Sequence, residues 1–134
     1  GTLTASQVCA GEENSLKIKI YGEKGGLEWE QMKPFELLCK PHGSAMLTYT
    51  AGVDKNNLYA EAYAACRTPS GHPEGYLEAF ANLYTGFAEA IRAFDGHYRG
   101  TDLIGIDEGV RGMAFIEAVV GNSASNEKWT KIEA

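Results

Sequence analysis

Two periodicities divide the chain: hydrophobic residues alternate with polar ones in the first half and recur at helical spacing in the second. In residues 16–21 three aliphatic side chains alternate with two lysines and a tyrosine, which indicates a strand with one apolar face. The glycine-rich run at 22–26 and the alternation at 27–30 predict a hairpin. The same pattern predicts an antiparallel meander of about five strands, with further members at 2–10, 35–40 and 45–50.

The second half predicts helices. Apolar residues recur every three or four positions from Tyr76 until Gly96, and a second such pattern begins near Asp107, a residue suited to an N-cap. The stretch 58–66 fits one or two helical turns, and 128–132 fits a short strand. These elements predict the α+β class: one domain in which an open, mostly antiparallel sheet has helices packed on one face.

Composition narrows the classes of function. With 44% hydrophobic residues the chain can bury a core without disulfides or a metal. Twelve basic and 18 acidic residues give a net charge of −6, which argues against nucleic acid and an anionic membrane as partners, since both favour a basic face. No apolar run approaches a membrane span. Cys9, Cys39 and Cys66 are widely spaced and indicate free thiols in a reducing, cytoplasmic compartment.

The candidate chemistry lies ahead of the first long helix, in "SGHPEGY" (70–76). The residue before a proline avoids helical backbone, and proline favours the first helical position, so we expect His72 at or next to the N-cap. Glu74 would lie in the first turn, where a carboxylate suits the helix dipole. Gly75 is costly there, and its missing side chain is expected to make room for something.

Two interpretations of this stretch stay open. A neutral imidazole can donate to and accept from a hydroxyl, so His72 could bind a sugar or polyol. On the residues alone, a plain helix cap is favoured over a ligand site. A cysteine hydrolase that uses Cys66 with His72 is a weaker hypothesis, because cysteine is usually a buried small apolar residue.

Most catalytic signatures are absent from the sequence. There is no dinucleotide fingerprint, no P-loop, and no spacing of cysteine and histidine that would hold a metal. The glycines at 22, 25 and 26 lie in a hairpin rather than between a strand and a helix, so they are interpreted as turn residues and not as a phosphate loop.

Three long blocks resemble one enzyme family, in the same order along the chain. They are "TASQVCAGEENSLKIKIYGEKGGLEWEQ" (4–31), "RTPSGHPEGYLEAFANLYTGFAEAI" (67–91) and "DEGVRGMAFIEAVVGNS" (107–123). Together they resemble the C-terminal domain of the glucose–fructose oxidoreductase, inositol dehydrogenase and MocA family. This domain has a dihydrodipicolinate-reductase-like fold, and the resemblance covers essentially the whole chain.

The resemblance implies a function for the parent protein. Members of that family join an N-terminal Rossmann domain, which binds NAD or NADP, to a second domain that shapes the substrate pocket. The implied parent is an NAD(P)-dependent oxidoreductase acting on a sugar, polyol or related hydroxyl compound. His72 would line its substrate pocket, with Arg67, Glu74 and Tyr76 as further candidates for substrate binding.

The family's dinucleotide fingerprint and its Glu-Lys-Pro lysine belong to the Rossmann domain. The resemblance therefore implies that residues 1–134 are a single substrate-binding and oligomerisation domain, without the Rossmann domain, a catalytic residue or a metal. Such a fragment would be inactive alone and would bind no cofactor. The strand-like start "GTLTASQV" also suggests a fragment, although cleavage of an expression tag would leave a similar start.

The mixed face of the predicted sheet offers a surface for self-association. Residues such as Tyr21, Leu38 and Thr48, rather than dense charge, are expected on it, so we expect a homo-oligomer. The alternative function is a free-standing ligand-binding and self-association module without catalytic activity.

Overall fold

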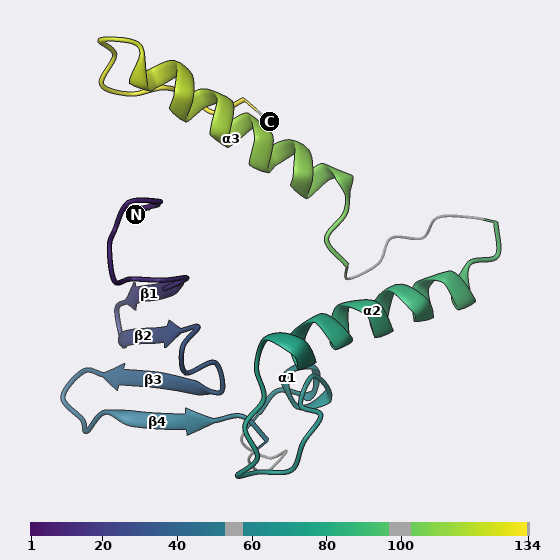
Figure 1. Cartoon of the computed structure of the whole chain (residues 1–134). Helices are drawn as coiled ribbons and strands as arrows, with labels where there is room; N and C mark the ends of the chain where they lie inside the picture. Colours follow the sequence, from purple (N-terminus) through teal and green to yellow (C-terminus); the bar gives the residue numbers. More distant parts are fainter. Residues whose placement is uncertain (53–57, 97–102, 134) are drawn as a thin grey trace. The chain divides into compact units, whose positions relative to one another are not determined.

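The computed structural model describes residues 1–52, 58–96 and 103–133. Its elements in chain order (Figure 1) are β1 (Lys17–Gly22), β2 (Gly25–Glu30), β3 (Glu36–Pro41), β4 (Leu47–Thr50), α1 (Ala60–Ala64), α2 (Tyr76–Ala93) and α3 (Ile106–Ser123). The α+β class with an open antiparallel sheet is confirmed. The chain forms two compact units, Gly1–Asn82 and Leu83–Ala134, which are described separately. That residues 1–134 act as a single domain stays a prediction.

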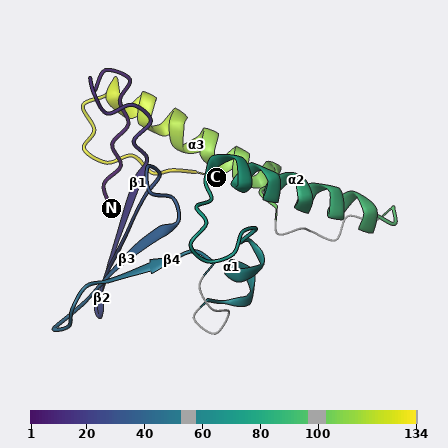
Figure 2. The same cartoon turned by 60° about the horizontal axis from the view of Figure 1, so that its bottom comes forward.

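The sheet lies in the first unit, and its strands pair in the order in which they occur along the chain (Figure 1); Figure 2 shows the same strands after a turn of the view. All three pairings are antiparallel. Gly22 opposes Gly25, so β1 and β2 are joined by a tight two-residue turn, and the predicted hairpin is confirmed. Gly25 has φ of +146°, and a Cβ there would lie 2.4 Å from the carbonyl oxygen of Lys40. Only glycine fits this position, where β2 passes β3.

The strand register gives the sheet two different faces. Residues directly opposite each other in neighbouring strands share a face, as do residues two positions apart in one strand. One side, the apolar face, carries Ile18, Ile20, Leu27, Trp29, Leu37, Cys39, Leu47 and Tyr49. The other side, the charged face, carries Lys17, Lys19, Tyr21, Glu28, Glu30, Glu36, Leu38, Lys40, Thr48 and Thr50.

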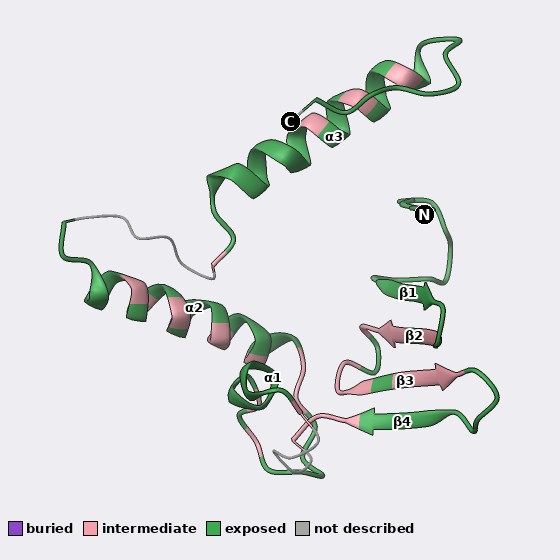
Figure 3. Cartoon of the chain, turned by 180° about the vertical axis from the view of Figure 1, so that it is seen from behind, coloured by how far each residue is buried: buried purple, intermediate pink, exposed green. Residues whose placement is uncertain are grey.

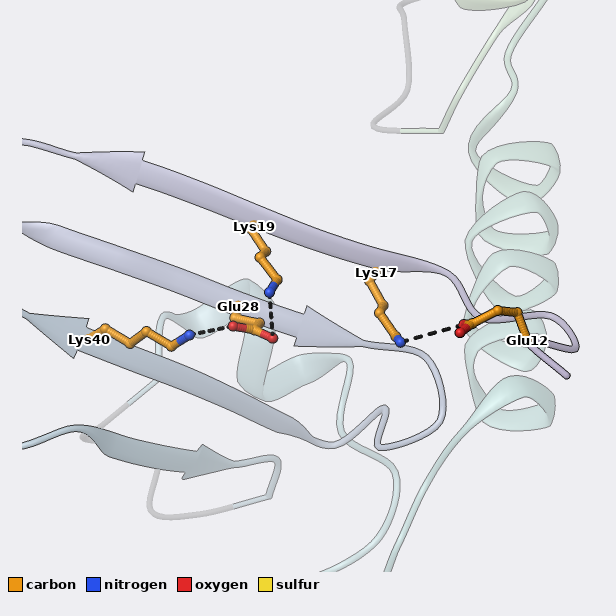
Figure 4. A network of polar contacts seen from close by, with 5 residues as sticks. All are labelled: Glu12, Lys17, Lys19, Glu28 and Lys40. Carbon is orange, nitrogen blue, oxygen red and sulfur yellow. Dashed lines mark hydrogen bonds and ion pairs between the residues drawn. The ribbon is translucent and has the colours of Figure 1, made fainter. Parts of the chain in front are cut away.

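Ion pairs cross three strands on the charged face (Figure 4). Glu28 on β2 lies between two lysines: its Oε1 is 3.3 Å from Nζ of Lys19 on β1, and its Oε2 contacts Nζ of Lys40 on β3. Lys17 forms a separate ion pair with Glu12, at 3.8 Å. Tyr21, Leu38 and Thr48 do share this face, but the expectation that it lacks dense charge is wrong.

Burial is incomplete among the described residues: none of them is fully buried (Figure 3). The two central strands, β2 and β3, are mostly half-buried, whereas the edge strand β1 is exposed along its length. On the apolar face, the side chains of Ile18 and Ile20 remain 52% and 54% exposed.

Several predicted boundaries are corrected by the structure. Residues 2–10 and 128–132 form no strand, so the sheet has four strands instead of about five. Asp107 is not the N-cap of α3, because Gly105 takes that place and its N–H donates to the Glu108 carboxylate over 3.0 Å. The short helix α1 within 58–66 is confirmed. None of the described helices is both long and apolar enough to cross a membrane.

Candidate functional site

The loop between α1 and α2 holds the sequence-predicted site residues, and a carboxylate joins its two ends. Oε1 of Glu74 accepts hydrogen bonds from the backbone N–H of Arg67 at 2.6 Å, from the backbone N–H of Thr68, and from the Thr68 hydroxyl at 2.8 Å. Carboxylates that accept backbone N–H groups make the stronger class of hydrogen bond. We call this arrangement of Glu74, Arg67 and Thr68 the loop clasp.

The electrostatics of Glu74 agree with this geometry. Partial burial of Glu74 acts to raise the pKa of its carboxyl group. The hydrogen bonds from Thr68 and Arg67, together with the charge of Arg67, outweigh that effect and lower the pKa below its ordinary value. Glu74 is therefore ionised at neutral pH, as the clasp requires.

Asn82, on the second turn of α2, fixes the start of the same loop. Its amide nitrogen donates to the carbonyl oxygen of Ala65 over 2.7 Å, and its Oδ1 accepts from Nε of Arg67 at 2.6 Å. The Arg67 side chain, a predicted substrate ligand, is thereby tied to the helix. Asparagine is unfavourable inside a helix. Its presence within α2 is the signal in the sequence that the Asn82 side chain has partners outside the helix.

A glycine outside the loop lets it pack closely against the end of the sheet. Gly52 has φ of +73°, and a Cβ at this position would lie 3.2 Å from both the Thr68 carbonyl oxygen and the Ser70 nitrogen. Any larger residue would press on the loop backbone. The loop is thus held by Glu74, by Asn82 and by its contact with Gly52.

His72 lies at the exposed tip of the loop, in a turn. Its backbone N–H donates to the carbonyl oxygen of Pro69 over 3.1 Å, and its ring Nδ1 is 3.3 Å from the same oxygen. The expectation that His72 lies at or beside the helix N-cap is wrong, because α2 begins at Tyr76. The Cys66 thiol, the other member of the hydrolase hypothesis, donates to the carbonyl oxygen of Ala62 at 3.4 Å.

The helix begins later than the proline predicts because other groups cap it. The N–H of Gly75 donates to Oε2 of Glu78 over 2.9 Å, and the Gly75 carbonyl accepts the first helical hydrogen bond, from Ala79. Glu74 is therefore outside the first turn. A Cβ on Gly75 would lie 3.5 Å from Pro34, an ordinary contact, so this glycine is not required by close packing.

Beside the loop clasp lies a cavity of about 650 Å³ within the first unit. Its lining includes Trp29, Phe35, Cys66, Glu74, Tyr76 and Asn82. Tyr76 packs on Phe80 with ring centroids 4.7 Å apart. The indole N–H of Trp29 donates to the Pro34 carbonyl over 2.8 Å, which fixes the ring in the wall. The polar groups of Trp29 and Asn82 are already used within the chain.

Of the four predicted ligands, the structure brings Glu74 and Tyr76 to the cavity wall and ties Arg67 to the clasp. His72 stands at the loop tip. Sequence reasoning missed Trp29 and Asn82 as members of this region. Trp29 bonds the backbone of Pro34, and Asn82 bonds the backbone of Ala65 and the side chain of Arg67; alternation and helical spacing do not reveal such partners.

Glutamate side chains take part in capping both long helices. Glu78 accepts from the N–H of Gly75 at the start of α2, and Glu108 accepts from the N–H of Gly105 at the start of α3. No group of three or more metal-ligating side chains occurs within the described ranges.

Comparisons with known proteins agree with the fold and the resemblance. No family model matches the chain. The uncharacterised oxidoreductase YfiI of Bacillus subtilis is 31% identical over 99% of this chain and 34% of its own length. An oxidoreductase from Sinorhizobium meliloti is 43% identical with a TM-score of 0.83, over 94% of this chain and 35% of its own.

A third relative has ligands in its structure. It is an inositol dehydrogenase homologue from Azotobacter vinelandii, complexed with NADH and myo-inositol, which is 35% identical with a TM-score of 0.62. The match covers 66% of this chain and 23% of that protein. The chain thus spans about a third or less of the length of these relatives.

Proposed function

Because the chain is homologous to a part of oxidoreductases that include inositol dehydrogenase homologues, as its resemblance to that family predicted, we propose that it supplies the substrate side of such an enzyme. The proposed reaction is hydride transfer between NAD or NADP and a sugar, polyol or related hydroxyl compound. The observation that carries the proposal is the similarity to the homologue whose structure holds NADH and myo-inositol.

The loop geometry supports a binding role for this region. Loops that bind small molecules work best when other parts of the protein hold them in one conformation. Here Glu74 and Asn82 hold the loop, and His72 is exposed at its tip. In the proposed enzyme His72 contacts a substrate hydroxyl. Arg67, Tyr76 and the remaining oxygen of Glu74 are further candidate contacts.

The proposal extends to assembly. Most oligomers of soluble proteins join identical chains, and in a two-fold dimer the same surface of each copy meets its counterpart. On the charged face of this sheet, lysines and glutamates are interspersed, so a second copy could meet it with opposite charges in register. We therefore include self-association through the charged face in the proposed function. A cytoplasmic location, which the free thiols indicate, is a further part of it.

The first test is His72→Ala in the natural protein that carries these residues, assayed with polyols and sugars in the presence of NAD or NADP. Loss of one hydrogen bond to a substrate hydroxyl should lower kcat/KM by about 10- to 100-fold. His42→Ala, in the turn between β3 and β4, is the matched control and should leave kcat/KM unchanged. Equal activity of the His72 variant and the control would remove His72 from the site.

The size of the native protein distinguishes the proposed enzyme from the alternative, a free-standing binding module. An antibody against this chain would detect a band far above 14.5 kDa in cell extract if the chain is part of the proposed enzyme. That larger protein should then bind a nicotinamide dinucleotide. A band at 14.5 kDa that binds none would favour the module.

A further inference from the structure

We propose that Glu74 is a positioning residue: through the loop clasp it holds His72 as the tautomer protonated on Nδ1, so that Nε2 meets the ligand. The inference depends on the proposed function in one respect, which is that the ligand is a substrate with hydroxyl groups. The clasp itself is a property of the described loop.

The tautomer follows from the partner of the ring. Nδ1 of His72 lies 3.3 Å from the carbonyl oxygen of Pro69, and a carbonyl oxygen can only accept a hydrogen bond. Nδ1 must therefore carry the proton of this contact. In the neutral ring Nε2 then has no proton and presents its lone pair.

The ring contact depends on the turn that brings Pro69 under His72. The backbone N–H of His72 bonds the same carbonyl over 3.1 Å, which makes residues 69–72 one tight turn. The loop clasp closes the segment around this turn, because Glu74 on one side bonds two consecutive N–H groups, those of Arg67 and Thr68, on the other. Without the carboxylate these N–H groups lose the acceptor that joins the loop ends.

Thr68 connects the clasp to His72 directly. Its hydroxyl oxygen lies 2.8 Å from Oε1 of Glu74 and 2.9 Å from the backbone carbonyl oxygen of His72. Both neighbours only accept, and a hydroxyl has a single proton, so it serves one of them at a time or is shared between them. Without the carboxylate, the Thr68 hydroxyl donates its hydrogen bond to the His72 carbonyl alone. This changes the hydrogen bonding of the residue whose ring meets the ligand.

The assignment has a consequence for the ligand. An unprotonated Nε2 accepts a hydrogen bond, and only a donor such as an alcohol O–H can supply it. A carbonyl group, which has no proton to donate, cannot pair with the neutral ring in this tautomer. The loop should therefore bind the hydroxyl form of a substrate more tightly than its carbonyl form at mildly alkaline pH.

The test is a long-range ¹H–¹⁵N correlation spectrum of the natural protein with ¹⁵N-labelled histidine, at mildly alkaline pH and with His72→Ala to assign the signal. For the wild type we expect a protonated Nδ1 and an unprotonated Nε2 at His72. In Glu74→Ala, the ¹⁵N chemical shifts of Nδ1 and Nε2 should move towards the values of the opposite tautomer or towards an average of the two tautomers. Glu78→Ala, which removes the neighbouring cap of α2 but no clasp contact, should leave them unchanged.

Either of two results would overturn the proposal: a wild-type ring protonated on Nε2, or a Glu74→Ala spectrum identical to that of the wild type. If Glu74→Ala does not fold, Glu74→Gln replaces it, because a neutral amide oxygen is a weaker acceptor of the same shape and should give a partial shift. The wild-type spectrum alone decides the tautomer.

Activity distinguishes this proposal from the proposed function. If His72→Ala lowers turnover, Glu74→Ala should raise KM for the hydroxyl substrate by about tenfold with a smaller change in kcat, since it disturbs a binding contact. A normal spectrum with a defective His72→Ala enzyme would reject the clasp and keep the function. A shifted spectrum with a fully active His72→Ala enzyme would keep the clasp and reject the function assigned to His72.

Discussion

Glu28 is placed so that its charge matters to the folded state. It lies between Lys19 and Lys40, and the hydrogen bond from Lys40 is the main cause of a lowered pKa, with Lys19 adding to it and desolvation opposing it. A carboxyl group whose pKa is lower in the folded state than in the unfolded chain stabilises the fold at higher pH. This contribution is lost as the pH falls from the ordinary carboxyl pKa through the lowered value.

We therefore expect Glu28→Gln to flatten the decline of stability in acid. The free energy of unfolding, measured by urea denaturation of the natural protein at several pH values below 5, should fall less steeply in the variant than in the wild type. Concentrated salt should reduce the difference, because all three side chains are reached by solvent. Parallel pH curves for the two proteins would mean that the three charges contribute nothing to stability.

At the scale of the elements, the β1–β2 hairpin depends on one glycine. Gly25→Ala would place a methyl group 2.4 Å from the carbonyl oxygen of Lys40 and 2.8 Å from the Cα of Pro41. Both contacts are with backbone, so β2 and β3 must separate. We expect a loss of about 2–4 kcal/mol in the free energy of unfolding, by chemical denaturation.

Gly43, in the turn between β3 and β4, provides the matched comparison. It also has a positive φ, of +68°, but a Cβ there would meet nothing within 4 Å. Gly43→Ala should cost only about 1 kcal/mol, the penalty of left-handed backbone. If the two variants were equally stable, the close approach of β3 to Gly25 would not be what the position requires.

The sequence predicted those elements that are recognised by a repeat within their own residues. Alternation placed the four strands, and helical spacing placed α2 and α3, since each period is set by the geometry of its own backbone. Residues 2–10 alternate equally well but form no strand. A strand also needs a hydrogen-bonded neighbour, which no local pattern reveals.

The candidate site shows the same limit. The proline rule placed the helix start near His72, yet the helix begins at Tyr76. Glu74 is drawn back to Arg67 and Thr68, and Glu78 caps Gly75 instead. The two carboxylates bond different stretches of backbone, and which stretch each one bonds depends on the path of the loop. The sequence therefore predicted residues of the site. It did not predict which glutamate caps the helix and which one forms the loop clasp.

For the molecule as a whole, the proposed self-association makes a prediction about one side chain. Tyr21 lies on the charged face and is 81% exposed, whereas Tyr59, at the start of α1, is 86% exposed and lies off the sheet. In the natural protein, Tyr21→Glu should reduce the mass found by light scattering, because it puts an unpaired charge into the contact between copies. Tyr59→Glu should keep the wild-type mass.

A wild-type mass for the Tyr21 variant would place the subunit contact elsewhere. A monomeric wild type at high concentration would reject self-association itself. Both results leave the loop clasp untouched, since that arrangement lies within a single unit.

The order of the strands has a consequence for how the chain is made. Each strand pairs with the next one along the chain, so every pairing closes a short loop, and such sheets form early. All four strands have left the ribosome once Thr50 is free, well before the residues of α3 are synthesised. During that interval Ile18 and Ile20 face solvent on β1, an edge strand of the described sheet. A chaperone that protects such edges would matter most during this part of synthesis.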